Sequence, residues 1–220
     1  MKIKYIFFDF DGVLAESVNI KTEAFRQMYL SEGKEFSNKV VDYHIANGGV
    51  SRYEKFKIFN GEWLGEDVTE SMSENLAQMF SDLVVEGVIN SPEVTGALAF
   101  LNASSEYKKY IITGTPTSEI EVILKERKMD HFFIKAYGSP NKKDFWVKKI
   151  LSENAIHPDE CVFIGDALAD YEAAMLNNVA FVLRETVEGK ELFKDYTGIR
   201  IKDMTSLESA INQINKSKRI

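Results

Sequence analysis

The chain has 220 residues, of which 45% are hydrophobic and 28% charged, a balance typical of a globular protein with one or two domains. Its formal net charge of -7 argues against general affinity for nucleic acid, and no apolar run is long enough to span a membrane. The single cysteine, Cys161, excludes an intrachain disulfide. With no secretory leader at its start, we expect the chain to work in a reducing cytoplasm.

The first predicted strand ends in two aspartates. Residues 5–8 form a short, continuously apolar run, as in a strand buried on both faces of a parallel sheet, and Asp9, Asp11 and Gly12 come after it. In such sheets the ligand crevice lies beyond the carboxyl ends of the strands. A helix-capping aspartate followed by a turn glycine would explain one of these residues, but not both. Two neighbouring buried carboxylates are costly without a cation or a proton, so this edge is predicted to be a catalytic site.

The periodicity of the remaining chain separates two regions. Residues 16–89 read as helical throughout, with one helix beginning near Ser51 and another ending near Gly87. Strands and helices then alternate: strands are predicted at 110–113, 132–137, 161–164, 179–183 and 199–201, and helices at 92 onward, 117–124 and 143–154. This alternation predicts an α/β fold, a doubly wound parallel sheet formed by residues 1–15 and 90–220, with residues 16–89 as an inserted all-helical domain.

Further polar residues follow the predicted strands. Thr113 and Gly114 can offer a hydroxyl and a backbone N–H to an anion, although Thr113 could instead cap the next helix. Asp166 ends a strand and Asp170 lies one helical turn later, so both can face one cation. Two aspartates favoured by the helix dipole are the alternative reading of this last pair.

The order of these motifs resembles that of the haloacid dehalogenase-like phosphatases. Asp9-Phe10-Asp11-Gly12-Val13-Leu14 is similar to their first motif, D-x-D-G-(T/V)-L, and residues 165–170 are similar to the fourth, G-D-x-x-x-D. The resemblance implies a Rossmann-like core with a helical cap over the active site. It also implies that Asp9 attacks phosphorus to form an aspartyl phosphate, while Asp11 acts as general acid and base.

The same resemblance assigns the other roles. Thr113 would hold a phosphate oxygen, with the N–H of Gly114 in the same anion nest. Lys142 or Lys143 would offset the anionic charge, and comparison with related sequences favours Lys143. The implied cofactor is Mg²⁺, and its implied ligands are Asp9, Asp11, Asp166 and Asp170, the last binding directly or through water.

The cap region bears on the substrate. Residues 49–52 are similar to a cap segment of β-phosphoglucomutase-like members, where an arginine binds the distal anionic group of the substrate, so Arg52 is a candidate for substrate binding. A solvated surface arginine is the alternative. Lys21 stands where the mutases carry a histidine that positions the general acid, and it is a second candidate. This departure disfavours a mutase.

The leading hypothesis is therefore a Mg²⁺-dependent phosphomonoesterase, an enzyme acting on a small phosphorylated metabolite such as a sugar phosphate or phosphoglycolate. The alternatives are a β-phosphoglucomutase-like phosphomutase and a catalytically silent binding module with the same fold. A dehalogenase is disfavoured, because that branch lacks the second aspartate of the Asp9–Asp11 pair. No nucleic-acid or membrane partner is expected, and the protein is expected to be a monomer or a weak homodimer.

Overall fold

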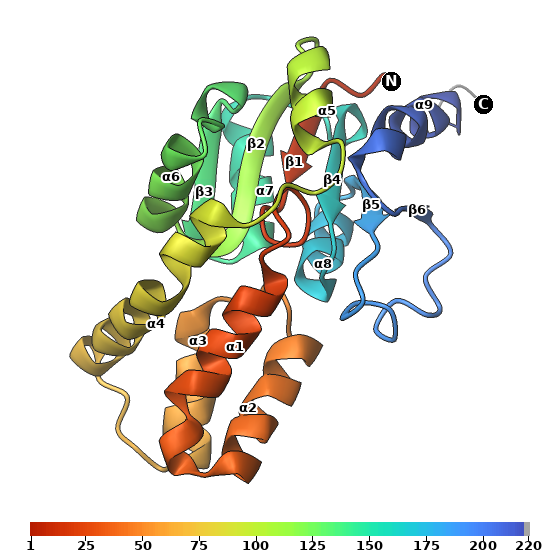
Figure 1. The fold of residues 1–220 in the computed structure, drawn as a ribbon. Coiled ribbons are helices and arrows are strands. Elements are labelled where there is room, and N and C mark those ends of the chain that lie inside the picture. Colours follow the sequence, from red (N-terminus) through yellow and green to blue (C-terminus); the bar gives the residue numbers. More distant parts are fainter. Residues whose placement is uncertain (218–220) are drawn as a thin grey trace.

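The computed structural model describes residues 1–217 and confirms the predicted α/β architecture (Figure 1). A parallel sheet of six strands has the order β3-β2-β1-β4-β5-β6, which places the first strand near its centre. The strands are β1 (Tyr5–Phe8), β2 (Lys108–Pro116), β3 (Lys135–Ser139), β4 (Cys161–Gly165), β5 (Ala180–Arg184) and β6 (Ile199–Ile201). A helical insertion lies between β1 and β2, at the carboxyl edge of the sheet (Figure 1).

The helices fall into two groups. Those of the sheet domain are α5 (Ala97–Ala103), α6 (Thr117–Glu126), α7 (Lys143–Glu153), α8 (Leu168–Leu176) and α9 (Leu207–Ser217). Those of the insertion are α1 (Val18–Met28), α2 (Lys34–Ala46), α3 (Arg52–Phe56) and α4 (Glu70–Asn90), with a π-helical stretch at Lys57–Trp63. Short 3-10 turns occur at Leu30–Glu32, Asp130–Phe132, Pro158–Glu160 and Met204–Ser206. Within residues 1–217, no helix is long and apolar enough to cross a membrane.

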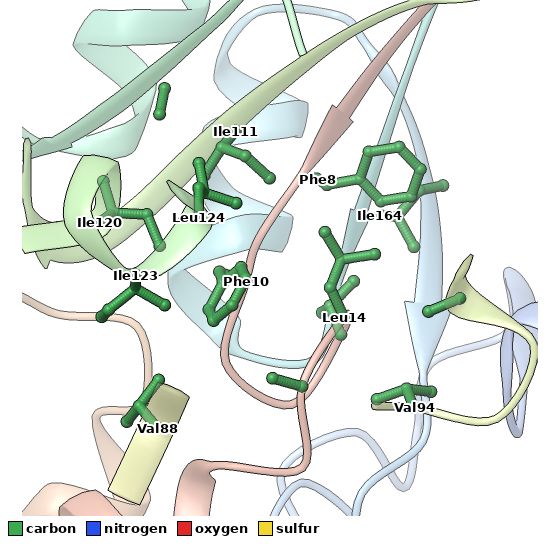
Figure 2. Packing of buried hydrophobic residues seen from close by; sticks show 14 of the residues in the cluster. Phe8, Phe10, Leu14, Val88, Val94, Ile111, Ile120, Ile123, Leu124 and Ile164 are labelled. Carbon is green, nitrogen blue, oxygen red and sulfur yellow. The ribbon is translucent and has the colours of Figure 1, made fainter. Parts of the chain in front are cut away.

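The two faces of the sheet carry separate apolar layers. Along β1 the side chains alternate, so Ile6 and Phe8 join the cluster that includes α5, α6 and α9, while Phe7 joins the cluster with α7 and α8. All three side chains are fully buried, as expected for a central parallel strand. Figure 2 shows Phe8 within the first layer, and Val88 at the end of α4 reaching toward Ile123 of α6. The last turn of α4 is therefore packed on the sheet domain.

An aromatic cluster lies inside the insertion and is continuous with the first apolar layer of the sheet. The centre of the Phe25 ring in α1 lies 4.4 Å from the centre of the Phe80 ring in α4 and 5.8 Å from that of the Phe59 ring in the π-helical stretch. These three rings are buried. Edge-to-face and tilted aromatic pairs of this kind hold the insertion together as a unit.

The two connections to the insertion run side by side. The N–H of Glu16 donates to the carbonyl of Pro92 at 2.9 Å, and Ala15 forms an antiparallel bridge with Glu93. The predicted helix start at Pro92 is therefore wrong, since α5 begins at Ala97. Proline lacks an N–H and so suits a short two-chain hinge as well as a first helical turn.

Two other predicted boundaries also differ. The predicted third strand at 132–137 begins at Lys135, because residues 130–132 form a 3-10 turn. Helix α4 continues past Gly87 to Asn90. A Cβ at Gly87 would lie 3.1 Å from Cγ2 of Ile20, so this glycine gives room for α1 to pack closely and does not end the helix.

Candidate active site

The carboxyl edge of the sheet brings together residues from three neighbouring strands. Asp9 follows β1, and its N–H donates to the carbonyl of Ile164 in β4 at 3.0 Å, which extends the strand pairing to the aspartate. Thr113 lies in β2 and Asp166 follows β4, the two neighbours of β1. All three side chains are buried and line one pocket between the sheet edge and the insertion.

Lys143 joins the buried carboxylates at this edge. Its Nζ lies 2.7 Å from Oδ2 of Asp9 and 2.6 Å from Oδ1 of Asp170. Burial alone would lower the pKa of Lys143, but Asp170 and Asp9 raise it above its usual value, so the lysine is a cation. Lys142 is exposed at the start of the same helix, α7. Of the two adjacent lysines, Lys143 therefore turns toward the aspartates and Lys142 faces solvent, and the role of Lys143 stays a prediction.

The aspartates form a compact acidic group. Ligand oxygens of Asp9, Asp166 and Asp170 lie within 4.8 Å of one another, and all three residues are buried. Burial raises the pKa of Asp166 well above its usual range, and the neighbouring Asp9 and Asp170 add to this effect. A hard divalent cation with oxygen ligands would relieve this repulsion, so the donor set fits Mg²⁺.

The turn after Asp9 makes room for this group. Gly12 has a φ of +75°, and a Cβ there would lie 2.3 Å from Oδ2 of Asp166. Any larger residue would therefore displace the Asp166 carboxylate, besides straining the backbone. Gly12 of the first motif thus leaves the space that the Asp166 carboxylate occupies.

Asp11 lies apart from the acidic group and has its own partners. The Oγ of Ser17 donates to its Oδ1 at 2.6 Å, the Oγ1 of Thr115 donates to its Oδ2 at 3.1 Å, and Lys21 forms an ion pair with the same Oδ2. The structure does not bring the Asp11 carboxylate into the predicted metal set. Burial would raise the pKa of Asp11, but Lys21 and these hydrogen bonds lower it below its usual value.

Lys21 belongs to α1 of the insertion and reaches down to the sheet edge. Its Nζ lies 2.6 Å from Oγ1 of Thr115, in addition to its ion pair with Asp11. The predicted substrate ligand Lys21 thus lines the pocket with its charge already matched by a carboxylate. The insertion therefore helps to fix the ionisation state of Asp11.

Arg52 also has a partner in the sheet domain. Its guanidinium donates to both carboxylate oxygens of Glu119 in α6, at 2.6 and 2.9 Å, and to Oγ of Ser81 in α4 at 2.7 Å. Its guanidinium carbon lies 4.5 Å from the centre of the Phe80 ring. Arg52 lines the pocket, but this buried fork links the insertion to the sheet domain. Its predicted role in substrate binding stays a prediction.

The loop before α3 packs against the carboxyl edge of the sheet. A Cβ at Gly114 would lie 2.6 Å from the carbonyl oxygen of Gly49, so a larger residue could not be accommodated without a shift. Gly49 itself has a φ of +73°, and a Cβ there would lie 3.1 Å from Nζ of Lys143. The insertion is therefore closed over the site, and Gly114, the predicted anion-nest residue, forms part of that contact.

Sequence analysis did not identify several of the residues that shape the site. Thr115 lies two positions after Thr113 on the same strand, so the two-residue period of a strand would have placed both side chains on one face. His44 and Lys55, which also line the pocket, and Glu119, which pairs with Arg52, carry no such local signal. Their roles arise where the insertion meets the sheet domain, or where two of its helices meet.

Comparisons with known proteins agree with the family resemblance seen in the sequence motifs. The family model of the haloacid dehalogenase-like hydrolases matches residues 3–175. A predicted phosphatase from Clostridium acetobutylicum is 19% identical with a TM-score of 0.72, covering 97% of this chain and 100% of its own. A predicted phosphoglycolate phosphatase from Haemophilus somnus is 19% identical with a TM-score of 0.70, covering 95% and 98%.

A candidate β-phosphoglucomutase from Bacteroides vulgatus is 16% identical with a TM-score of 0.74, covering 98% of this chain and 91% of its own. At these identities the structural likeness establishes the shared fold. A search of curated proteins finds no match.

Proposed function

Since the chain belongs to the haloacid dehalogenase-like hydrolases, we propose that it is a Mg²⁺-dependent phosphomonoester hydrolase that works through an aspartyl phosphate. Its substrate is a small phosphorylated metabolite, a sugar phosphate or a phosphoglycolate-like acid. The observation that carries the proposal is the position of Lys143, whose Nζ contacts Asp9 and Asp170 beside Asp166. A buried cation among three carboxylates suits a site that must accept a dianionic phosphoryl group.

Asp9 is the proposed nucleophile. Its Oδ1 accepts a hydrogen bond from the N–H of Phe10 at 2.7 Å and its Oδ2 contacts Lys143, so the carboxylate is held in one orientation. One of its oxygens bonds to phosphorus while the bond from phosphorus to the ester oxygen breaks. A carboxylate needs no neighbouring base for this attack, because it is ionised at neutral pH.

Asp11 is the proposed proton carrier. It gives a proton to the departing ester oxygen, and then takes one from the water that attacks the aspartyl phosphate. Hydrolysis releases inorganic phosphate and restores the Asp9 carboxylate. Ser17, Lys21 and Thr115 favour the ionised form of Asp11, so Asp11 takes up a proton from solvent before the first transfer and is ionised again for the second.

Asp9, Asp166 and Asp170 are the residues that would hold Mg²⁺. The ion supplies positive charge that polarises the phosphoryl group and offsets the repulsion between the phosphate and Asp9. Thr113 and Gly114 line the same pocket, and the Thr113 hydroxyl and the Gly114 N–H are the proposed ligands of phosphate oxygens.

Released phosphate is the direct test. The purified protein is incubated with a panel of phosphorylated sugars and short phosphorylated acids, with Mg²⁺, with chelator and with Ca²⁺ in its place. We expect turnover with Mg²⁺, none after chelation, and little with Ca²⁺, which prefers longer bonds and a higher coordination number. Asp9→Asn should abolish turnover, and Asp130→Asn, at an exposed site, should retain it.

Each alternative has a distinct result. Full activity of the chelated enzyme or of Asp9→Asn would refute the proposed mechanism. Conversion of a sugar phosphate to its isomer without release of phosphate would identify a mutase. Binding of phosphorylated ligands without any turnover would identify a binding module.

A further inference from the structure

The pocket is lined by three cationic side chains, and one of them differs from the other two. Two are paired with carboxylates, Lys21 with Asp11 and Arg52 with Glu119. Lys55 has no carboxylate partner among residues 1–217. Its Nζ contacts Nδ1 of His44 at 2.9 Å and lies 5.6 Å from the centre of the Phe25 ring. A lysine that lines a pocket without a carboxylate partner is available to an anion.

The surroundings of Lys55 make an unpaired charge costly. The residue is 2% exposed, and burial lowers its pKa to about 7, with Lys21, Lys143 and Arg52 acting in the same direction. An anion in contact with Nζ would favour the charged form again. Placing a lysine in such a position is unfavourable unless a ligand completes the pair.

His44 orients the ammonium group of Lys55 through the contact at Nδ1. Burial, followed by the charges of Lys55 and Lys21, lowers the pKa of His44 well below its usual value, so the ring is neutral. A neutral ring that accepts from the ammonium at Nδ1 carries its proton on Nε2. The Lys55 ammonium therefore keeps two further N–H donors for an anion.

We propose that Lys55, oriented by His44, binds a second anionic group on the non-reacting end of the substrate, a carboxylate or a further phosphoryl group. This inference rests on the proposed phosphatase function. Lys55 and Asp9 line the same pocket, so one small molecule can reach both. The helix that carries Lys55 begins just after the Gly49 loop, which is seated on Gly114 and close to Lys143. In the closed insertion this ammonium therefore lines the pocket that also contains Asp9.

Matched substrates separate this role from catalysis. Phosphoglycolate carries a carboxylate, 1,2-ethanediol bisphosphate carries a second phosphoryl group, and 2-hydroxyethyl phosphate has the same length with a neutral end. We expect the wild-type enzyme to prefer one of the two esters with an anionic end over the neutral one by about 10- to 150-fold in kcat/KM, the range for one hydrogen bond to a charged group. The preferred ester tells a carboxylate from a phosphoryl group.

Lys55→Met removes the ammonium and keeps an apolar stem of similar length. This variant should lose the preference, while its kcat/KM on 2-hydroxyethyl phosphate changes less than about threefold and its thermal stability is equal or higher, because a buried unpaired charge is gone. Lys55→Arg should recover part of the preference. Lys57→Met is the matched control, since Lys57 is solvent-exposed and paired with Glu54, and it should behave as wild type.

Three results would overturn the inference. A wild-type enzyme that hydrolyses all three esters equally refutes the anion subsite and leaves the phosphatase function intact. Equal losses on all three esters with a lower melting temperature in Lys55→Met would make Lys55 a structural residue. Absence of hydrolysis of any phosphomonoester would refute the proposed function, and this inference with it.

Discussion

Replacing Glu119 with glutamine should loosen the closed insertion without unfolding the protein. Glu119 lies in α6 of the sheet domain and accepts two hydrogen bonds from Arg52 in α3, at 2.6 and 2.9 Å. Glutamine has the same size but offers one acceptor oxygen and no charge, so at least one charge-assisted bond is lost. Such a bond is worth about 1.5–3 kcal/mol, or about 10- to 150-fold in an equilibrium constant.

The loss should appear in the closing equilibrium, because the two partners belong to different domains. When the insertion opens, Arg52 regains water and is no longer a buried, unpaired charge. The proposed nucleophile Asp9 is only 3% exposed beneath the closed insertion, so productive binding requires opening and closing. We therefore expect kcat/KM to fall by about 10- to 150-fold, the range given above for the closing equilibrium. The free energy of unfolding should change by less than about 1 kcal/mol.

Three measurements check this. The kcat/KM values for phosphoglycolate and for an aryl phosphate should fall together, since both substrates need closure. Amide hydrogen exchange in α3 should increase, and urea denaturation should show a nearly unchanged free energy. Glu121→Gln, on the exposed face of the same helix, is the control and should match wild type. Arg52→Met should add little to Glu119→Gln, because the two residues act as one pair.

Two outcomes would refute this reasoning. A loss of about 3–5 kcal/mol in the free energy of unfolding would mean that the pair is a permanently buried bridge within one cooperative unit. A loss on phosphoglycolate alone, with the aryl phosphate unaffected, would return Arg52 to its predicted role in substrate binding.

Two further predictions concern the sheet edge. Asp11→Asn should severely impair hydrolysis of alkyl phosphates but have less effect on the first step with aryl phosphates, whose leaving groups need no proton. A burst of aryl alcohol in rapid-mixing experiments would reveal this difference. Equal inhibition of both substrate classes would argue against the role of Asp11 as acid. Gly114→Ala should lower kcat/KM by about 5- to 150-fold, the equivalent of the 1–3 kcal/mol cost of overpacking, because its Cβ would lie 2.6 Å from the carbonyl oxygen of Gly49. Gly61→Ala, where the nearest atom is 3.5 Å away, is the comparison, and equal effects at both positions would refute the closure argument.

The residues at the sheet edge could be predicted because each one is fixed by its own strand. An apolar run followed by Asp9 needs no knowledge of distant residues to be read as a strand end, and Asp166 follows the same rule. Parallel strands then bring these ends to one edge, whichever loops connect them. Lys143 was predicted less directly, since only the fold decides which of two adjacent lysines turns inward.

Contacts between the two domains could not be predicted in this way. Arg52 could be recognised as a candidate ligand, but nothing near it in the sequence indicates that Glu119, 67 positions away, occupies its guanidinium. Pro92 misled the prediction because the same residue type suits both a helix start and an extended hinge. In both cases the outcome depends on how the insertion sits on the sheet, which no local pattern encodes.

The paired hinge has a consequence for how such a protein can diversify. The chain leaves the sheet domain at Ala15 and returns at Glu93, two residues that are bridged to each other, while β1 and β2 remain neighbours in the sheet. A segment whose two ends meet can be exchanged, lengthened or lost over evolution without altering the order of the strands. Asp9, Asp166 and Lys143 lie outside this segment, whereas Arg52 and Lys55 lie within it. The residues proposed for catalysis and those proposed for selectivity therefore lie in parts of the chain that can vary independently.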